Sequence, residues 1–308
     1  MIKSAFLWLW CRLTSLSDER ITFARWEMFL MRAAFAGLVL WSMGKNLPPD
    51  SQPLPNGLCV FLDLTWLAQP ETWAQAQWIT AGFLACFVFG LSGGITLLVP
   101  VFFYVAMGSL INSQGAIKHH SQLIAMTLIA LWLSTMVACI WKAIRSRRFA
   151  IFDDVTMQRI GIQWAMIAIA AAYVTSAFSK LLATDGTWIF RTPNLAVELV
   201  KSHLTVFHDT ITTSQIAEYP PLAAFLVDHV WLAPILFGPG LFIELFFFLA
   251  LAGRGWAALF GMGAILMHVI ITLVMKLVFP EHEALMLIFF VNIPFWTVVF
   301  IRGAWRKI

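Results

Sequence analysis

The chain has 308 residues, of which 60% are hydrophobic and only 12% are charged. A soluble domain is about half apolar and about one quarter charged, so this composition excludes an ordinary water-soluble fold and predicts an integral membrane protein. The formal net charge is +4, but the basic residues stand at the ends of apolar runs and form no aromatic-interleaved basic patch, which excludes a nucleic-acid partner.

The first 20 residues combine Lys3 with an aromatic run from Phe6 to Trp10. A secretory signal peptide needs small residues at a cleavage site after such a run, and charged residues beginning with Arg12 follow instead. We therefore expect residues 1–20 to form an amphipathic segment on the inner membrane surface. A retained signal anchor is the alternative.

Eight apolar runs follow that are long enough to form helices across a bilayer core, which takes about 20 residues each. The run 73–112 is too long for one helix, and Ser92-Gly93-Gly94 divides it into a hairpin of two. The other runs are 26–43, 121–141, 160–182, 231–252, 256–278 and 284–301. The sequence thus predicts an all-α, polytopic transmembrane helix bundle of about eight spans, with residues 1–308 as a single domain.

Basic residues indicate how this bundle is oriented. If the N-terminus is cytoplasmic, the cytoplasmic segments hold thirteen Lys and Arg residues and the opposite segments hold six. Cytoplasmic loops retain Lys and Arg preferentially, so we expect both termini in the cytoplasm. Residues 183–229 then form an outer-face loop with short amphipathic helices.

Tyr173, Ser176 and Lys180 fall on one face near the outer end of the run 160–182, because they are spaced at i, i+3 and i+7. Two interpretations of Lys180 are open. A buried lysine that loses its proton is a general base. A lysine at the membrane surface instead extends its ammonium group to the lipid headgroups.

Histidines gather on the outer side of the expected topology. His119 and His120 open the run 121–141, where a neutral imidazole would hydrogen-bond a substrate oxygen or relay a proton. A polar helix start in water is the alternative. His268 lies within the run 256–278 and points either into the bundle or at a backbone carbonyl.

Metal and dithiol chemistry are not expected. His282 stands between two glutamates, but adjacent side chains on a helix point apart and no ligand stands at the i, i+4 spacing. The four cysteines show no CxxC spacing.

Arg32 lies inside the expected span 26–43, and Glu244 lies inside 231–252. An unpaired charge within a membrane is costly, and both residues fall in the inner half of the expected topology. We therefore predict a structural ion pair between Arg32 and Glu244, with a catalytic role for Glu244 as the alternative.

These motifs resemble the HTTM family, which includes the membrane part of vitamin K-dependent gamma-carboxylase. The similar stretches are Gln163 to Leu181 with Asp185-Gly186-Thr187-Trp188, Arg20 to Trp41, His119-His120-Ser121, and Glu244 with His268 and Phe279-Pro280.

The resemblance implies a site at the outer face. Lys180 corresponds to the lysine base that deprotonates the vitamin K hydroquinone, and His120 to a histidine of the same catalytic site. A quinol cofactor, with oxygen and carbon dioxide, would serve such a carboxylase. We expect substrate to contact His119, Tyr173, Ser176, Trp188 and His268.

The chain departs from the carboxylase because it ends at Ile308, with no room for the soluble domain that holds the protein substrate. It is similar in length to a bacterial membrane protein that matures a sporulation-delaying peptide toxin together with a separate partner protein. We therefore expect a bacterial inner-membrane protein. It is either an enzyme, or a subunit of one, acting on a quinol or peptide, or a non-catalytic partner that holds or secretes a peptide, or a quinone-linked subunit resembling DoxX.

Overall fold

The computed structural model describes residues 23–45, 47–115, 119–146, 152–210, 221–275 and 277–305. The expected amphipathic segment 1–20 lies outside them. The described part is helical, with an isolated β-bridge between Leu91 and Phe152. The all-α fold class predicted from the sequence is confirmed for this part of the chain.

Several of the described helices are long and apolar enough to cross a membrane, as a multi-pass membrane protein requires. Five qualify on their own: α2 (Arg25–Gly44), α4 with α5 (Gly93–Thr96 and Leu98–Asn112), α6 (His119–Ser146), α7 (Val155–Leu182) and α12 (Arg254–Met275). Two bent pairs raise the number to seven. These are α10 (Pro221–Asp228) with α11 (Leu232–Leu245), bent by 97°, and α13 (Pro280–Leu285) with the π-helix η6 (Met286–Val291) and α14 (Ile293–Trp305), bent by 42°.

The structure therefore supports five to seven spans where the sequence predicts about eight. The remaining expected span corresponds to α3 (Pro70–Val88), which does not qualify. Its first half carries Glu71, Gln75 and Gln77, and these lower its apolar character.

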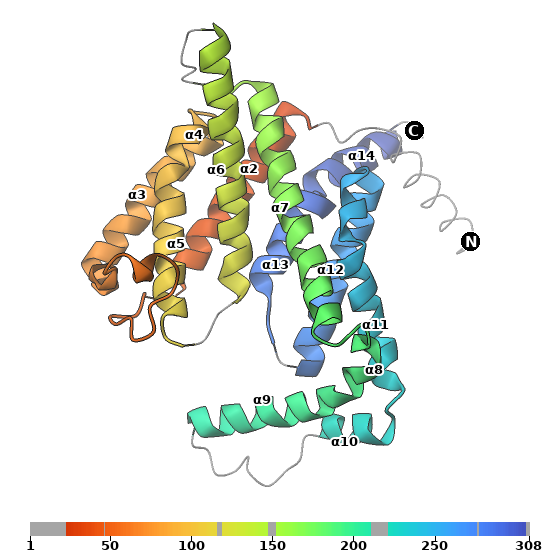
Figure 1. The fold of residues 1–308 in the computed structure, drawn as a ribbon. Coiled ribbons are helices and arrows are strands. Elements are labelled where there is room, and N and C mark those ends of the chain that lie inside the picture. Colours follow the sequence, from red (N-terminus) through yellow and green to blue (C-terminus); the bar gives the residue numbers. More distant parts are fainter. Residues whose placement is uncertain are drawn as a thin grey trace.

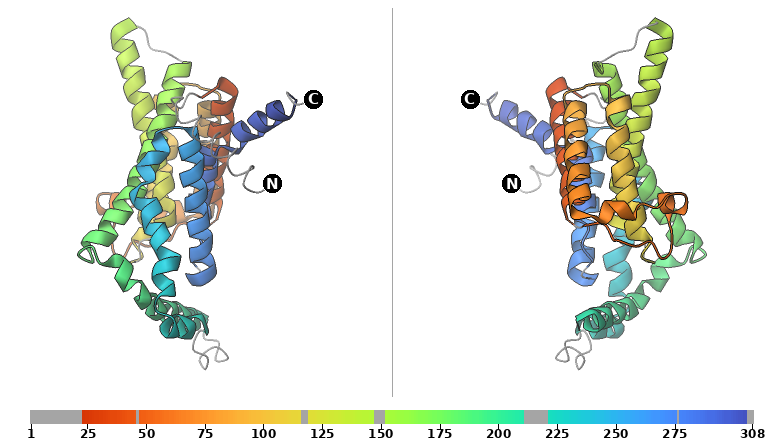
Figure 2. Two further views of the ribbon diagram at one scale, coloured as in Figure 1. Left: turned by 90° about the vertical axis from the view of Figure 1, so that its right-hand side faces the viewer. Right: turned by 90° about the vertical axis from the view of Figure 1, so that its left-hand side faces the viewer.

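The helices run up and down between the two ends of the described bundle (Figure 1). One end holds Arg25, Arg145 and Arg254, at the start of α2, the end of α6 and the start of α12. The opposite end carries α8 (Trp188–Arg191), η3 (Thr192–Asn194), α9 (Leu195–Thr210) and α10, which lie across the bundle axis (Figures 1 and 2). Residues of α9 to α11 share a small apolar core of Ala196, Leu199, Ala223, Leu226 and Ala233.

The hairpin predicted at Ser92-Gly93-Gly94 is confirmed, since α3 ends at Val88 and α4 begins at Gly93. Ser92 has a φ of 30°, and a Cβ on Gly94 would lie 2.7 Å from the Cα of Met136. No residue larger than glycine fits there without moving α6.

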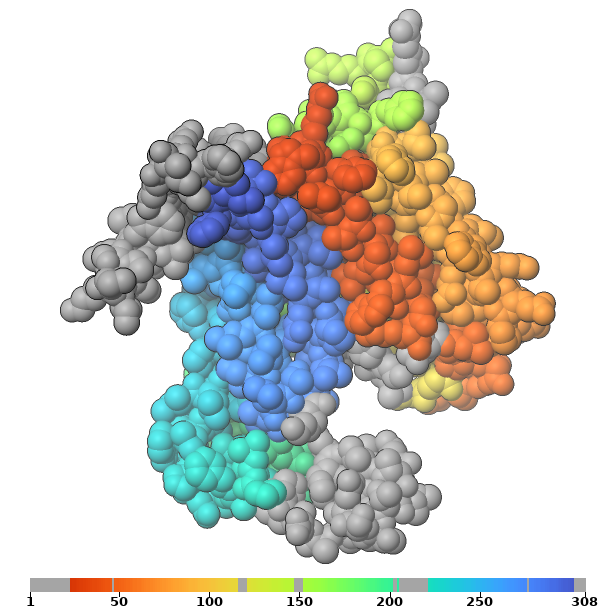
Figure 3. Space-filling view, turned by 180° about the vertical axis from the view of Figure 1, so that it is seen from behind, coloured from red at the N-terminus to blue at the C-terminus, as the bar shows by residue number. Residues whose placement is uncertain are grey.

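On another face, α2 lies beside α13 and η6 (Figure 3). Lys45 Nζ donates to Glu281 Oε1 at 2.7 Å, and the rings of Phe35 and Phe289 meet edge to face. The first and last described segments of the bundle are thereby joined. Two short 3-10 helices, η1 (Gly57–Val60) and η2 (Thr65–Ala68), connect α2 to α3.

Asp154 caps the start of α7. Its Oδ1 accepts from Met157 N, and its Oδ2 accepts from Lys142 Nζ, both at 2.9 Å. Burial acts to raise the pKa of Asp154, but these hydrogen bonds outweigh it and hold the pKa below the ordinary value. Since the folded pKa is depressed, the stabilisation is complete above 3.8 and is lost as the pH falls through the lowered value.

We expect Asp154→Ala to lower the free energy of unfolding by about 1 kcal/mol at neutral pH, the usual effect of losing an N-cap. Asp154→Asn keeps a capping oxygen, so it should lose clearly less. Thermal unfolding at neutral pH and near pH 3 measures both effects. Equal losses in the two variants, or a loss in Asp154→Ala relative to the original chain that does not shrink in acid, would contradict this role of the Asp154 carboxylate.

Candidate functional site

A cavity of about 270 Å³ lies among five helices, α6, α7, α11, α12 and α13, and gathers most of the polar candidates. Its polar lining comes from α7 (Tyr173, Ser176 and Lys180), α11 (Glu244), α12 (His268) and α13 (His282). The three residues expected on one face of α7 therefore all reach the same space. We name this space the polar cavity.

Glu244 is the centre of the polar cavity. Its carboxylate accepts from Lys180 Nζ at 2.5 Å through Oε2, and from Ser176 Oγ at 3.5 Å through Oε1. The Glu244 side chain is 7% exposed and that of Lys180 is 34% exposed. Lys180 Nζ also lies 5.5 Å from the ring centroid of Trp188 at the start of α8. The ammonium is thus held inside the bundle by a carboxylate, which does not fit the headgroup alternative.

His268 of α12 also lines the polar cavity. It is 5% exposed, and its Nε2 lies 3.4 Å from Tyr173 Oη, within hydrogen-bonding distance. Its ring stacks on Phe279 at 5.2 Å between centroids, and the ring of His282 meets it edge-on at 5.3 Å. His268 Nδ1 has no hydrogen-bond partner among the described residues. Because a buried polar atom without a partner is costly, this nitrogen is suited to a polar group of a bound molecule.

A second cavity of about 570 Å³ adjoins the polar cavity and shares Lys180, Met267, Ile271 and Phe279 with it. We name it the apolar cavity. Most of its lining is aliphatic or aromatic, including Trp188, Leu236, Leu241, Ile243, Leu266 and Ile270. The two spaces together suit an amphiphilic molecule, with a polar head beside Lys180 and an apolar part between α11 and α12.

The backbone at the start of α6, which carries the two histidines expected at the site, lies near the polar cavity. The helix begins at His119, and Leu123 in its first turns lines the polar cavity. The side chains of His119 and His120 lie outside the described part of the chain. Their roles remain predictions.

The predicted ion pair between Arg32 and Glu244 is wrong. Glu244 pairs with Lys180, whereas Arg32 Nη1 donates to the Phe87 carbonyl at 3.1 Å and caps the end of α3. The prediction treated 231–252 as one straight span. Instead α11 ends at Leu245 and meets α10 at 97°, which places Glu244 in the last turn of a short helix packed on α7.

Sequence reasoning did not assign His282 or Phe279 to the site, and it gave Glu244 a catalytic role only as the alternative to an ion pair. Phe279-Pro280 was available as a signal, because a proline in the first helical turn marks the start of a helix, and His282 stands in that turn. No sequence signal identified Lys180 as the partner of Glu244. Their contact joins residues 64 positions apart.

Within the described residues, no group of three or more His, Cys, Asp or Glu side chains is arranged to hold a metal ion. No family model, no functionally described protein and no solved structure matches the chain.

Proposed function

We propose that this protein is a membrane enzyme, or the membrane subunit of one, that carries out base chemistry on an amphiphilic quinol or peptide substrate at the outer face of a bacterial inner membrane. The observation that carries the proposal is the largely buried Lys180–Glu244 pair, which lies where a polar and an apolar cavity meet. An ion pair that only stabilises the fold can be packed on all sides, whereas a pair that reacts needs an adjoining cavity for the substrate.

The proposed topology has both termini in the cytoplasm and the polar cavity toward the outside. The basic end of the described bundle supports this orientation, because Lys and Arg are retained on the cytoplasmic side. In this topology α3 is an eighth span, which packs against α2 and α5.

The base is the ion pair and not a free lysine amine. Lys180 Nζ, already donating to Glu244 Oε2, delivers that proton to the carboxylate and takes one from a substrate O–H. Glu244 then holds the proton as a neutral acid, and the Lys180 ammonium remains beside the new negative charge. Ser176 keeps Glu244 in place throughout.

The residues present fit a quinol head. Aromatic rings of Tyr173 and Phe279 flank the polar cavity, and Lys180 and His268 Nδ1 offer hydrogen-bonding groups on different sides of it. A prenyl tail would occupy the apolar cavity. When bound, a quinol supplies the oxidisable ring of gamma-carboxylase-like chemistry. His120 is the proposed second catalytic residue.

The test uses the purified chain in bilayer discs with reduced naphthoquinols, with and without a prenyl tail. We expect oxygen-dependent consumption, measured by absorbance, and a lower KM for the tailed quinol. Adding a glutamate-containing peptide and labelled carbon dioxide would identify carboxylation. If no quinol is consumed with or without the peptide, the proposed function is wrong.

His268→Phe should raise the KM for quinol about tenfold or more, because a lost hydrogen bond to a buried group costs about 1–3 kcal/mol. His229→Phe is the matched control, since His229 lies at the end of α10 and lines neither cavity. An equal effect of both substitutions would show that His268 does not contact the head.

A further inference from the structure

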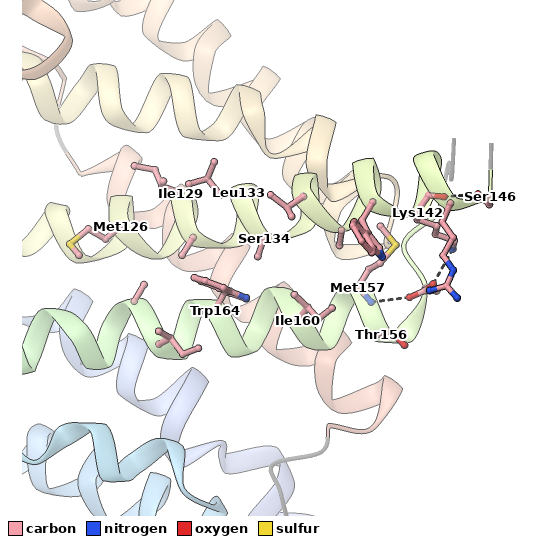
Figure 4. Close-up of a pocket in the computed structure, with 18 residues that line it drawn as sticks. Met126, Ile129, Leu133, Ser134, Lys142, Ser146, Thr156, Met157, Ile160 and Trp164 are labelled. Atoms are coloured by element: carbon pink, nitrogen blue, oxygen red, sulfur yellow. Dashed lines mark hydrogen bonds and ion pairs between the residues drawn. The ribbon is translucent and has the colours of Figure 1, made fainter. Parts of the chain in front are cut away.

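A long groove runs between α6 and α7, separate from both cavities (Figure 4). Its volume is about 1300 Å³. Small residues recur at every fourth position of α6, at Ala130, Ser134 and Ala138, so they share one face and leave room along the helix. Bulkier residues complete the lining, among them Ile129, Leu133, Val137, Ile160, Trp164 and Ile167.

The groove changes character at one end. Lys142, Arg145 and Ser146 of α6, Thr156 of α7 and the N-cap residue Asp154 line it there, while the rest is apolar except for Ser134. Lys142 is engaged by Asp154 at 2.9 Å. Arg145 is exposed and forms no ion pair with another residue in the described part of the chain. A guanidinium group therefore stands at the end of an apolar channel.

The dimensions suit a lipid chain. From Met126 to Trp141 the apolar part extends over about 22 Å, at about 1.5 Å per residue. One leaflet contributes about half of a hydrocarbon core of about 30 Å. An acyl chain whose headgroup lies at Arg145 would therefore find apolar lining along its whole length.

We propose that this groove binds an anionic phospholipid of the leaflet at the basic end, with its phosphate on Arg145 and its chains along Ala130, Ser134 and Ala138. Arginine offers a planar fork of donors that matches phosphate oxygens. Charge complementarity favours a lipid over a partner helix, because an apolar helix in the groove would leave the guanidinium without an anion. The proposal depends on membrane insertion and not on the quinol chemistry.

The test is native mass spectrometry of the full chain with phosphatidylglycerol or phosphatidylcholine of identical acyl chains. We expect tighter binding of phosphatidylglycerol. Arg145→Gln should weaken that binding about fivefold, the change given by about 1 kcal/mol per basic residue. It should weaken binding of phosphatidylcholine clearly less, because the choline cation balances the phosphate charge of that lipid. Ala138→Phe, which fills the groove without changing charge, should weaken binding of both lipids.

Arg25→Gln is the matched control, since it removes an exposed arginine at the same end of the bundle but on α2. It should leave lipid binding unchanged. Equal affinity for both lipids would overturn the proposal, and so would binding that Arg145→Gln and Ala138→Phe do not alter. If the chain instead formed a dimer that Ala138→Phe dissociated, with lipid binding unchanged, the groove would be occupied by a second copy of the chain. That result would also overturn the proposal.

Discussion

Lys180→Met is expected to lower quinol turnover by about 10²–10⁴-fold, the usual contribution of a positioned acid–base group. The variant loses both the proton carrier and the positive charge beside the reacting oxygen. It also leaves Glu244, whose side chain is 7% exposed, without its cation. The stability cost should stay below the ~3–5 kcal/mol of a fully buried pair, because the Lys180 side chain is 34% exposed and water reaches the site. Turnover and thermal unfolding are measured on the same preparations.

Two further variants separate chemistry from structure at this pair. Glu244→Gln should lose turnover to a similar extent, since an amide cannot take up the proton. The exchanged pair Lys180→Glu with Glu244→Lys should recover thermal stability but not turnover. Lys201→Met controls for loss of a lysine, because Lys201 pairs with Glu198 on an exposed surface. If the exchanged pair turns over quinol like the original chain, the pair is structural.

Arg254→Met is expected to lower the free energy of unfolding by about 3–5 kcal/mol, since it strands a buried carboxylate. Glu27 is 1% exposed and accepts from Arg254 Nη1 at 2.6 Å and Nη2 at 3.0 Å. Asn292 Nδ2 donates to the same carboxylate at 2.5 Å, and Ala24 N at 3.0 Å. This network joins α2, α12 and the junction of η6 with α14, where Asn292 has a φ of 51°.

Thermal or denaturant unfolding of the detergent-solubilised chain measures this loss. Glu198→Gln is the control, because its ion pair with Lys201 has side chains 53% and 64% exposed and should be worth less than about 1 kcal/mol. The double variant Glu27→Leu with Arg254→Met removes both charges and should be more stable than Arg254→Met alone. A loss below about 1 kcal/mol in Arg254→Met would contradict the structural role of the network.

Properties that depend on neighbouring residues could be predicted from the sequence. Apolar runs of about 20 residues predicted the helices that could cross a membrane, and Ser92-Gly93-Gly94 predicted the break before α4. Helical spacing predicted that Tyr173, Ser176 and Lys180 share a face, and all three line the polar cavity. These features follow from local composition and from a fixed helical period.

The partners of the buried charges were decided only by the tertiary structure. Glu27 meets Arg254 across 227 positions, and Glu244 meets Lys180 because α11 is short and bent against α10. A sequence reveals that a charge in an apolar run needs a partner. Which residue becomes that partner depends on how far along each other two helices are aligned, and this is set by bends and helix ends. The same reason explains why Arg32 caps α3 instead of pairing with Glu244. Composition determined that this chain forms apolar helices, and packing determined which side chains meet to form the site.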